Sequence, residues 1–171
     1  DRQGEEFNQG KVIAELRGRH REIERVAGEC HWPETLGRNI RRMADLIGLN
    51  AIEQAVLAFA VMIHSDKHLV AAAGYLGDLS LQQLYASLSS ILCLPEAHVR
   101  NAFSSRSVLS RSGLVKLDRD SCFDLRNRLD VISGNFVDVM LGEEADPIEL
   151  LRGKVEVASQ AALTLADYPH L

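Results

Sequence analysis

A run of nine apolar residues, Ala55 to Ile63, constrains the fold of this chain more than any other feature of its sequence. The run follows Asn50 and Glu53, which have the spacing of a helix-starting capping box, so we expect a helix that begins at Ala51. Such a helix is apolar on all sides and belongs at the centre of a helical domain, where other elements cover it. The run is far too short to span a bilayer.

Further helices are expected on both sides of this run. Pro33 favours a helix start and Gly48 a helix end, and the apolar residues between them fall on one face: Leu36, Ile40, Met43 and Ile47. Another short helix is expected around His68 to Leu76. We assign residues 33–79 to a helical subdomain. Residues 1–32 form a polar extension with a solvated, charged helix from Lys11 to about Glu29.

The segment 80–120 predicts a winged-helix-like unit. Ser80 and Gln83 form a second capping box. After a short break at Cys93-Leu94, Pro95 starts a second helix, whose Val99, Ala102 and Phe103 we expect to point inward. Two apolar runs, 108–109 and 114–117, then flank a turn at Ser112-Gly113 and predict a small hairpin. Helix, short turn, helix and hairpin is the order of a winged helix. The predicted fold class is therefore mainly α, a helical domain that contains a helix-turn-helix plus a small β-hairpin.

The last segment, 121–171, is acidic. From Asp120 to Leu171 there are ten acidic and four basic residues. Apolar residues between Leu125 and Met140 suggest one or two short helices broken near Gly134, and Asp146-Pro147 opens another that ends at Gly153. We expect short helices followed by a linker.

Charge and cysteine content restrict the class of protein. The net charge of −5 argues against a general nucleic-acid binder, which would normally carry a basic surplus. The three cysteines, Cys30, Cys93 and Cys122, are too few and too scattered for a disulfide framework and are typical of a reducing compartment. No secretory signal precedes them. We expect a cytoplasmic protein that makes no use of a membrane.

No motif predicts catalysis or a bound metal. Neither a P-loop nor a Gly-rich dinucleotide fingerprint occurs. His64 and His68 have helical spacing, but Ser65 stands where a metalloprotease has its Glu, and Ser65-Asp66 suggests a new helix start. Adjacent residues such as Cys30 and His31 are usually not partners in a catalytic dyad. We expect no catalytic residue, no metal ligand and no cofactor in this chain.

The winged-helix-like unit supplies the candidate contact residues. Between Pro95 and Arg119 there are five basic and two acidic residues, a local surplus of three. Cations at these positions could contact phosphates, and Arg or Asn could contact base edges. Winged helices also dock proteins, so the same residues are candidates for a protein partner. They are His98, Arg100, Asn101, Arg106, Arg111, Lys116 and Arg119.

Four stretches carry a resemblance to a known family. They are Leu46-Ile-Gly-Leu-Asn-Ala-Ile-Glu53, Val56-Leu-Ala-Phe-Ala60, Leu109-Ser-Arg-Ser-Gly-Leu-Val-Lys-Leu-Asp118 and Leu163-Thr-Leu-Ala-Asp-Tyr-Pro-His-Leu171. In this order they resemble the segment that precedes the ATPase core in certain bacterial AAA-family ATPases. The resemblance spans roughly Pro33 to Leu171, and the charged extension before Cys30 has no match in it.

The resemblance implies a non-catalytic N-terminal domain that recruits a substrate or partner, or regulates the ATPase. The ATP-binding core, with its ATP and Mg²⁺, would lie beyond Leu171, so this chain would be a fragment of a homo-oligomeric protein. The alternative is a winged-helix DNA-binding module of a regulator. A free-standing enzyme has no constellation of residues in its favour.

Overall fold

The computed structural model describes residues 9–26 and 32–142. Backbone contacts divide the chain into two units, Asp1–Trp32 and Pro33–Leu171. The described residues form nine helices and one two-stranded sheet, which confirms the mainly helical class. In the first unit, α1 (Gln9–Val26) carries the charged pattern predicted for a helix starting near Lys11, and ion pairs such as Arg19–Glu15 lie on its exposed surface.

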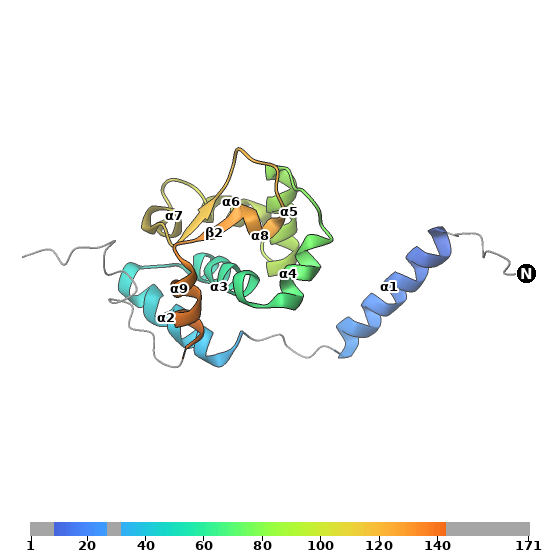
Figure 1. Ribbon diagram of the computed structural model, residues 1–171, viewed down its shortest axis with the longest axis horizontal. Helices are drawn as coiled ribbons and strands as arrows, with labels where there is room; N and C mark the ends of the chain where they lie inside the picture. The colour runs from blue at the N-terminus through green and yellow to red at the C-terminus, as the bar shows by residue number, and fades with distance from the viewer. Residues whose placement is uncertain (1–8, 27–31, 143–171) are drawn as a thin grey trace, which may run out of the picture. The chain divides into compact units, whose positions relative to one another are not determined.

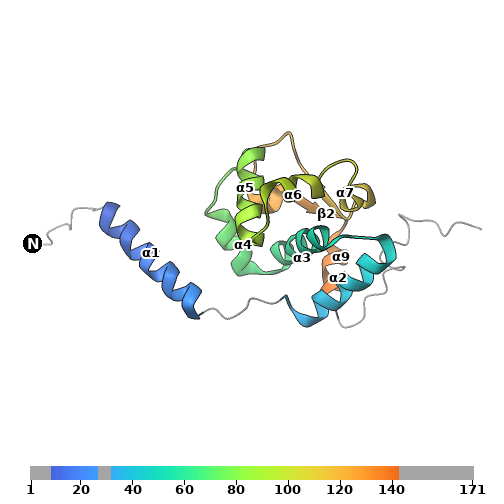
Figure 2. The same cartoon turned by 180° about the vertical axis from the view of Figure 1, so that it is seen from behind.

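The elements of the second unit follow one another closely. In chain order they are α2 (Glu34–Ile47), α3 (Ala51–Ser65), α4 (Lys67–Gly74), α5 (Leu81–Leu92), α6 (Glu96–Ala102), α7 (Val108–Ser112), β1 (Val115–Leu117), α8 (Leu125–Arg128), β2 (Leu129–Val131) and α9 (Gly134–Leu141). Figures 1 and 2 show α3 in the middle of this unit, with α2 and α9 on one side and α6 with the strands on the other.

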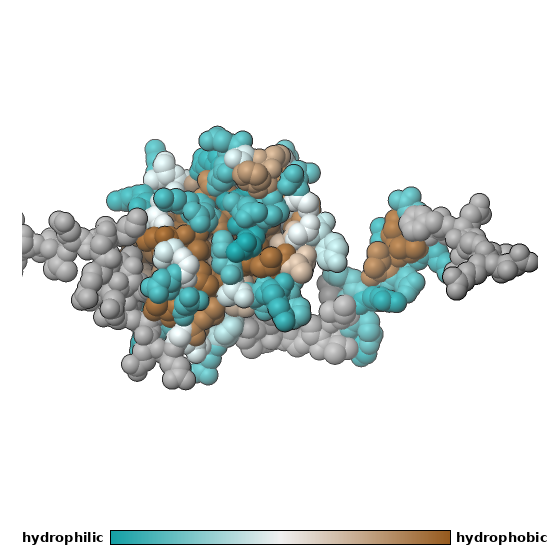
Figure 3. Space-filling model, in the orientation of Figure 1, coloured by the Kyte–Doolittle hydropathy of each residue, from teal (hydrophilic) through white to brown (hydrophobic). Residues whose placement is uncertain are grey.

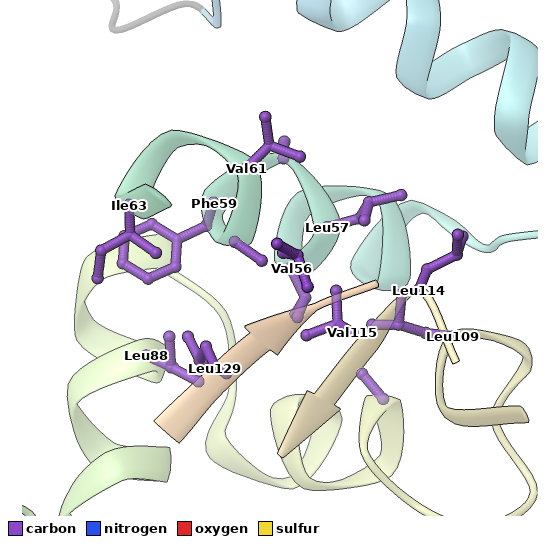
Figure 4. Packing of buried hydrophobic residues seen from close by; sticks show 14 of the residues in the cluster. Val56, Leu57, Phe59, Val61, Ile63, Leu88, Leu109, Leu114, Val115 and Leu129 are labelled. Atoms are coloured by element: carbon purple, nitrogen blue, oxygen red, sulfur yellow. The ribbon is translucent and has the colours of Figure 1, made fainter. Parts of the chain in front are cut away.

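Helix α3 is the centre of the core, as its apolar run predicts. It contacts the strand β2 and six helices of the unit, namely α2, α4, α6, α7, α8 and α9. Its buried residues leave the helix in several directions (Figure 4): Val56 points towards the strands, whereas Val61 points away from them. Full burial of one such aliphatic side chain contributes about 1.5–3 kcal/mol, so α3 holds the layers together.

Local capping signals set the helix boundaries where the sequence predicts them. The Asn50 side chain accepts hydrogen bonds from the backbone N–H groups of Ile52 and Glu53, and the Glu53 carboxylate accepts one from the Asn50 N–H. Gly48 ends α2 in the left-handed conformation, with a φ of 82°, which glycine adopts without steric cost. Asp66 caps the start of α4 and separates His64 from His68, as expected.

The predicted hairpin is wrong in its pairing. Residues 108–109 do not form a strand; they begin α7, and β1 instead pairs with β2 in antiparallel register, with Leu117 opposite Leu129. The two strands are joined by residues 118–128, which include α8. Two packed helices, α5 and α6, are followed by α7 and the two-stranded sheet, and the predicted tight hairpin is absent from the described residues.

Helix α7 forms because its free N-terminal N–H groups find acceptors. The Ser107 hydroxyl accepts from Ser110 N–H at 3.1 Å, and the buried Glu53 carboxylate accepts from Leu109 N–H at 3.1 Å. These groups have no partner within the helix, so side-chain acceptors stabilise its first turn. Gly113, with a φ of 69°, then ends the helix and directs the chain into β1.

The helices predicted between Leu125 and Met140 are interrupted by a strand. Residues 129–131 form β2, whose Leu129 and Val131 are buried while Asp130 is exposed. This alternation fits a strand with one covered face better than it fits a helix. The helix expected from Asp146 to Gly153 lies outside the described residues.

Within the described residues, no single helix is long and apolar enough to cross a membrane. Helices α3 and α4 reach the required length and hydropathy only when they are taken together, and the chain bends by 96° between them.

Candidate partner-binding surface

Helix α6 presents three of the seven candidate contact residues to the surface. Val99, Ala102 and the following Phe103 are buried against the core, as the sequence predicts. His98, Arg100 and Asn101 are exposed, whereas Glu96 is partly buried. The short helix is thus fixed by its apolar face, and its polar face is available for contact.

Arg100 is held by its own neighbours. Its Nε and Nη2 atoms donate to Glu96 Oε1 at 3.0 and 2.6 Å, and its guanidinium lies 4.6 Å from the centre of the Tyr85 ring. A cation over an aromatic face and an i,i+4 ion pair both fix the side chain along α5 and α6. Arg100 therefore serves the packing of these two helices, which the sequence did not indicate.

Arg119 is also engaged inside the protein. Its Nη2 atom donates to the carbonyl oxygen of Phe103, the residue that ends α6, at 2.5 Å. A cation at the carboxyl end of a helix satisfies an otherwise unpaired carbonyl. Arg119 thereby ties the segment after β1 to the end of α6.

Three other candidates meet at one hollow. His98, Asn101 and Arg106 line a depression of about 510 Å³ together with the start of α3, from Asn50 to Glu53. We call this depression the α3–α6 hollow. It is built from segments about 50 residues apart in the chain, so the sequence gave no indication that α3 would form half of it. Glu53, one of its lining residues, is held in place by the hydrogen bond from Leu109 N–H.

The last two candidates lie elsewhere. Lys116 is on the exposed face of the sheet, opposite Asp130, and lines a second depression of about 470 Å³. We call this second depression the sheet hollow; it also involves His64, Leu117, Asp118, Arg126 and Asn127. Arg111 is exposed on α7. The seven residues therefore do not form one continuous basic surface.

Arg128 is the residue that sequence reasoning missed most clearly. It is 1% exposed, although it stands in the charged sequence Arg126-Asn127-Arg128. Its Nε and Nη2 donate to the Asp118 carbonyl at 2.9 and 2.7 Å, and its Nη1 donates to the Leu79 carbonyl at 2.5 Å. A buried guanidinium needs such acceptors, and here it fixes the segment between the two strands.

The Asp118 carboxylate closes a tight turn on the rim of the sheet hollow. The Ser121 hydroxyl and the backbone N–H groups of Ser121 and Asp120 donate to it, and the charge of Arg128 lies nearby. These hydrogen bonds favour the ionised form and lower the pKa of Asp118 below its usual value. Its oxygens are thus largely engaged within their own turn.

Metal-ligating and thiol groups are dispersed in the part of the chain that the structure describes. No group of three or more His, Cys, Asp and Glu residues there is arranged to hold a metal ion. His64 Nε2 donates to the Leu129 carbonyl at 2.5 Å and so covers an edge of β2. Cys93 and Cys122 are exposed free thiols, whereas Cys30 and His31 lie outside the described residues.

Comparison of the chain with protein-family models, with curated proteins and with solved structures finds no match. The described residues are therefore characterised by their own geometry: a central apolar helix, the α3–α6 hollow, the sheet hollow, and seven candidate residues of which Arg100 and Arg119 make internal contacts.

Proposed function

We propose that this chain is a non-catalytic module that recruits a protein partner or substrate to the core of an AAA-family remodelling ATPase, or regulates that core. The observation that supports this proposal best is the hydrogen bond from Leu109 N–H to the Glu53 carboxylate. It joins two of the stretches on which the family resemblance rests, 46–53 and 109–118. The α3–α6 hollow, lined by the same Glu53, opens beside this junction.

The buried positions of the resembling stretches support a shared architecture. Residues 56–60 are all buried in α3, and Leu109, Leu114 and Val115 are buried around it. Core residues determine a fold but not a function, so the activity must come from the surface that this fold presents. The fourth stretch, 163–171, lies outside the described residues.

Within the module we propose a winged-helix-like arrangement of α5, α6 and the β1–β2 sheet. The two helices pack against each other, and the sheet follows them in the chain. The segment 118–128 takes the place of a tight wing turn. Its position is held by Arg128, through the carbonyls of Asp118 and Leu79.

Protein docking at the α3–α6 hollow accounts for the surface better than DNA binding does. The Arg100 guanidinium donates to Glu96, and the Arg119 guanidinium donates to the Phe103 carbonyl. These contacts reduce the number of cations available for phosphates. The net charge of −5 also opposes a polyanion. The hollow instead offers Asn101 and Arg106 as polar groups beside the partly buried Ile52, a mixture typical of the rim and floor of a protein interface.

The first experiment uses the complete gene product. We expect it to contain a P-loop, to bind ATP and Mg²⁺ through that separate core, to be cytoplasmic and to form homo-oligomers. Deletion of residues 33–142 should leave basal ATP hydrolysis but abolish its response to the partner and the partner's binding. If no P-loop is present, or if regulation and binding both survive the deletion, the proposal is wrong.

A second experiment locates the surface. Arg106→Glu reverses a charge in the α3–α6 hollow, whereas Arg111→Glu makes the same change on α7 and serves as the matched control. We expect only Arg106→Glu to weaken partner binding, by about tenfold or more, which is the effect of losing one charged hydrogen bond at an interface. Equal effects of the two variants would remove the hollow from the docking surface.

The DNA alternative has its own test. Duplex binding that depends on phosphate contacts weakens steeply as salt rises, with a slope of about −0.9 per contact on logarithmic axes. For a docking module we expect weak binding without such a slope. A steep slope that is lost when Arg100, Arg106 and Arg111 are neutralised would instead establish the winged-helix DNA binder.

A further inference from the structure

The sheet hollow contains a buried donor with no partner. Arg126 begins the charged sequence of α8 and lines this hollow of about 470 Å³. Its Nε atom is buried and has no hydrogen-bond partner among the described residues. A buried N–H without an acceptor is destabilising, so an acceptor from outside the described residues is favoured at this position.

Most other polar groups of the sheet hollow are already engaged. His64 Nε2 donates to the Leu129 carbonyl, and the Asn127 side-chain amide donates to Asp124 Oδ2 at 2.8 Å. The Asp118 carboxylate accepts the N–H groups of Asp120 and Ser121. The Asp130 carboxylate also lines the hollow, yet neither it nor any of these groups hydrogen-bonds to Arg126 Nε.

Lys116 is the second unengaged cation of the hollow. It lies opposite Asp130 in the strand register, yet the described residues give it no ion pair. Its side chain is on the exposed face of β1, because Val115 is buried on the other face and Leu117 packs against the core there. Arg126 and Lys116 therefore flank the same hollow from α8 and from β1.

We infer that the sheet hollow binds a carboxylate, held between Arg126 Nε and the Lys116 ammonium group. The carboxylate belongs to an acidic side chain of the recruited protein segment. This source rests on the proposed recruiting function, whereas the site itself rests only on the geometry of the hollow.

A singly charged carboxylate fits this site better than a phosphate. Asp118 and Asp130 also line the hollow, so its two fixed positive charges are balanced by two negative ones. For a dianion, attraction to Arg126 and Lys116 and repulsion by the two carboxylates both double. The free-energy cost of removing an anion from water grows with the square of its charge, so the monoanion is favoured. The planar fork of a guanidinium also matches the two oxygens of a carboxylate.

The test is an NMR titration of the full chain with sodium acetate, followed at the side-chain Nε–Hε signal of Arg126. Sodium chloride at equal ionic strength and inorganic phosphate are titrated in parallel. We expect a saturable shift with acetate, no saturable shift with chloride, and weaker binding of phosphate. A shift that is the same for acetate and chloride, or tighter binding of phosphate, would overturn the inference.

Two variants separate the site from a general effect of charge. Lys116→Ala changes an exposed residue, so the chain should remain folded while acetate binds about tenfold more weakly. Arg111→Ala removes an exposed cation outside the hollow and should leave the acetate affinity unchanged. If both variants bind acetate as the original chain does, Lys116 is not part of a site and the inference fails.

The titration also distinguishes failure of the site from failure of the proposed function. It requires neither ATP nor a partner protein, so a saturable acetate shift would stand even if no ATPase core exists. Conversely, absence of the shift would remove the carboxylate site but leave recruitment through the α3–α6 hollow untouched. Arg126→Lys, which keeps the charge but removes the Nε–H group, provides the corresponding check from α8.

Discussion

The carboxylate of Glu53 accepts the backbone N–H of Leu109 at 3.1 Å across 56 residues of sequence. Its second oxygen accepts the Asn50 N–H at 2.9 Å, so one buried side chain starts both α3 and α7. This dual use places the start of α7 against the central helix. Glu53 also lines the α3–α6 hollow. Figure 3 shows hydrophilic and hydrophobic residues intermixed over the displayed face of this unit.

Replacement of Glu53 by Gln should destabilise the fold. The amide offers one oxygen to two N–H donors and turns its own NH₂ towards one of them, so a buried donor loses its acceptor. We expect a loss of about 1–3 kcal/mol in the free energy of unfolding, measured by urea denaturation. Glu34→Gln alters an exposed ion pair with Arg38 and should change stability by less than about 1 kcal/mol. Equal losses would show that the Leu109 contact contributes nothing.

Truncation of Arg128 should be among the most damaging single changes to a charged residue. Arg128→Ala leaves the carbonyls of Leu79 and Asp118 without their donors in a buried environment. We expect a loss of about 3 kcal/mol or more in thermal or urea unfolding. Arg111→Ala, at an exposed position, should stay within about 0.5 kcal/mol. An Arg128→Ala protein as stable as the Arg111→Ala protein would contradict this role.

The pKa of Asp118 depends chiefly on Ser121. Its carboxylate is stabilised by the Ser121 hydroxyl, so Ser121→Ala should move the Asp118 pKa upwards, towards the usual value of 3.8. Carbon-detected NMR titration of the side-chain carboxyl measures this shift. Because the pKa is lower in the folded state, the carboxylate contributes stability above about pH 3.8, and this contribution is lost as pH falls through the folded pKa. In Ser121→Ala, the free energy of unfolding should therefore fall less steeply as the pH is lowered below this value. An Asp118 carboxyl titration unchanged by Ser121→Ala would contradict the assignment.

Arg100→Ala should affect stability rather than recruitment. The side chain contributes a cation–π contact with Tyr85 and an exposed ion pair with Glu96. These contacts together are worth about 1 kcal/mol, since exposed pairs and exposed cation–π contacts are each weak. Chemical denaturation measures the loss, and partner binding should change less than it does in Arg106→Glu. A large loss of binding without loss of stability would return Arg100 to the contact surface.

Local features of the sequence were sufficient to predict most helices. The capping box of Asn50, the one of Ser80, and the left-handed Gly48 act within a few residues, so their effect is present in the sequence itself. The apolar run from Ala55 to Ile63 likewise predicted the central helix, because a helix without a polar face has few other places in a folded chain.

Pairing between distant segments was decided by the tertiary structure. The sequence 108–112 carries apolar residues that suit a strand as well as a helix; Glu53 and Ser107 favour the helix by accepting its first N–H groups. Once these residues are helical, β1 must find another partner, and the alternating burial of 129–131 supplies it.

The same distinction applies to the surface. Sequence alone identified the exposed face of α6, since Val99 and Phe103 fix which side is buried. It could not show that Arg100 and Arg119 make internal contacts. Nor could it show that Arg128 is buried, or that Arg126 and Lys116 flank one hollow. A charged side chain looks the same in sequence whether it meets water or a carbonyl, because its partner is chosen only when distant backbone segments come together.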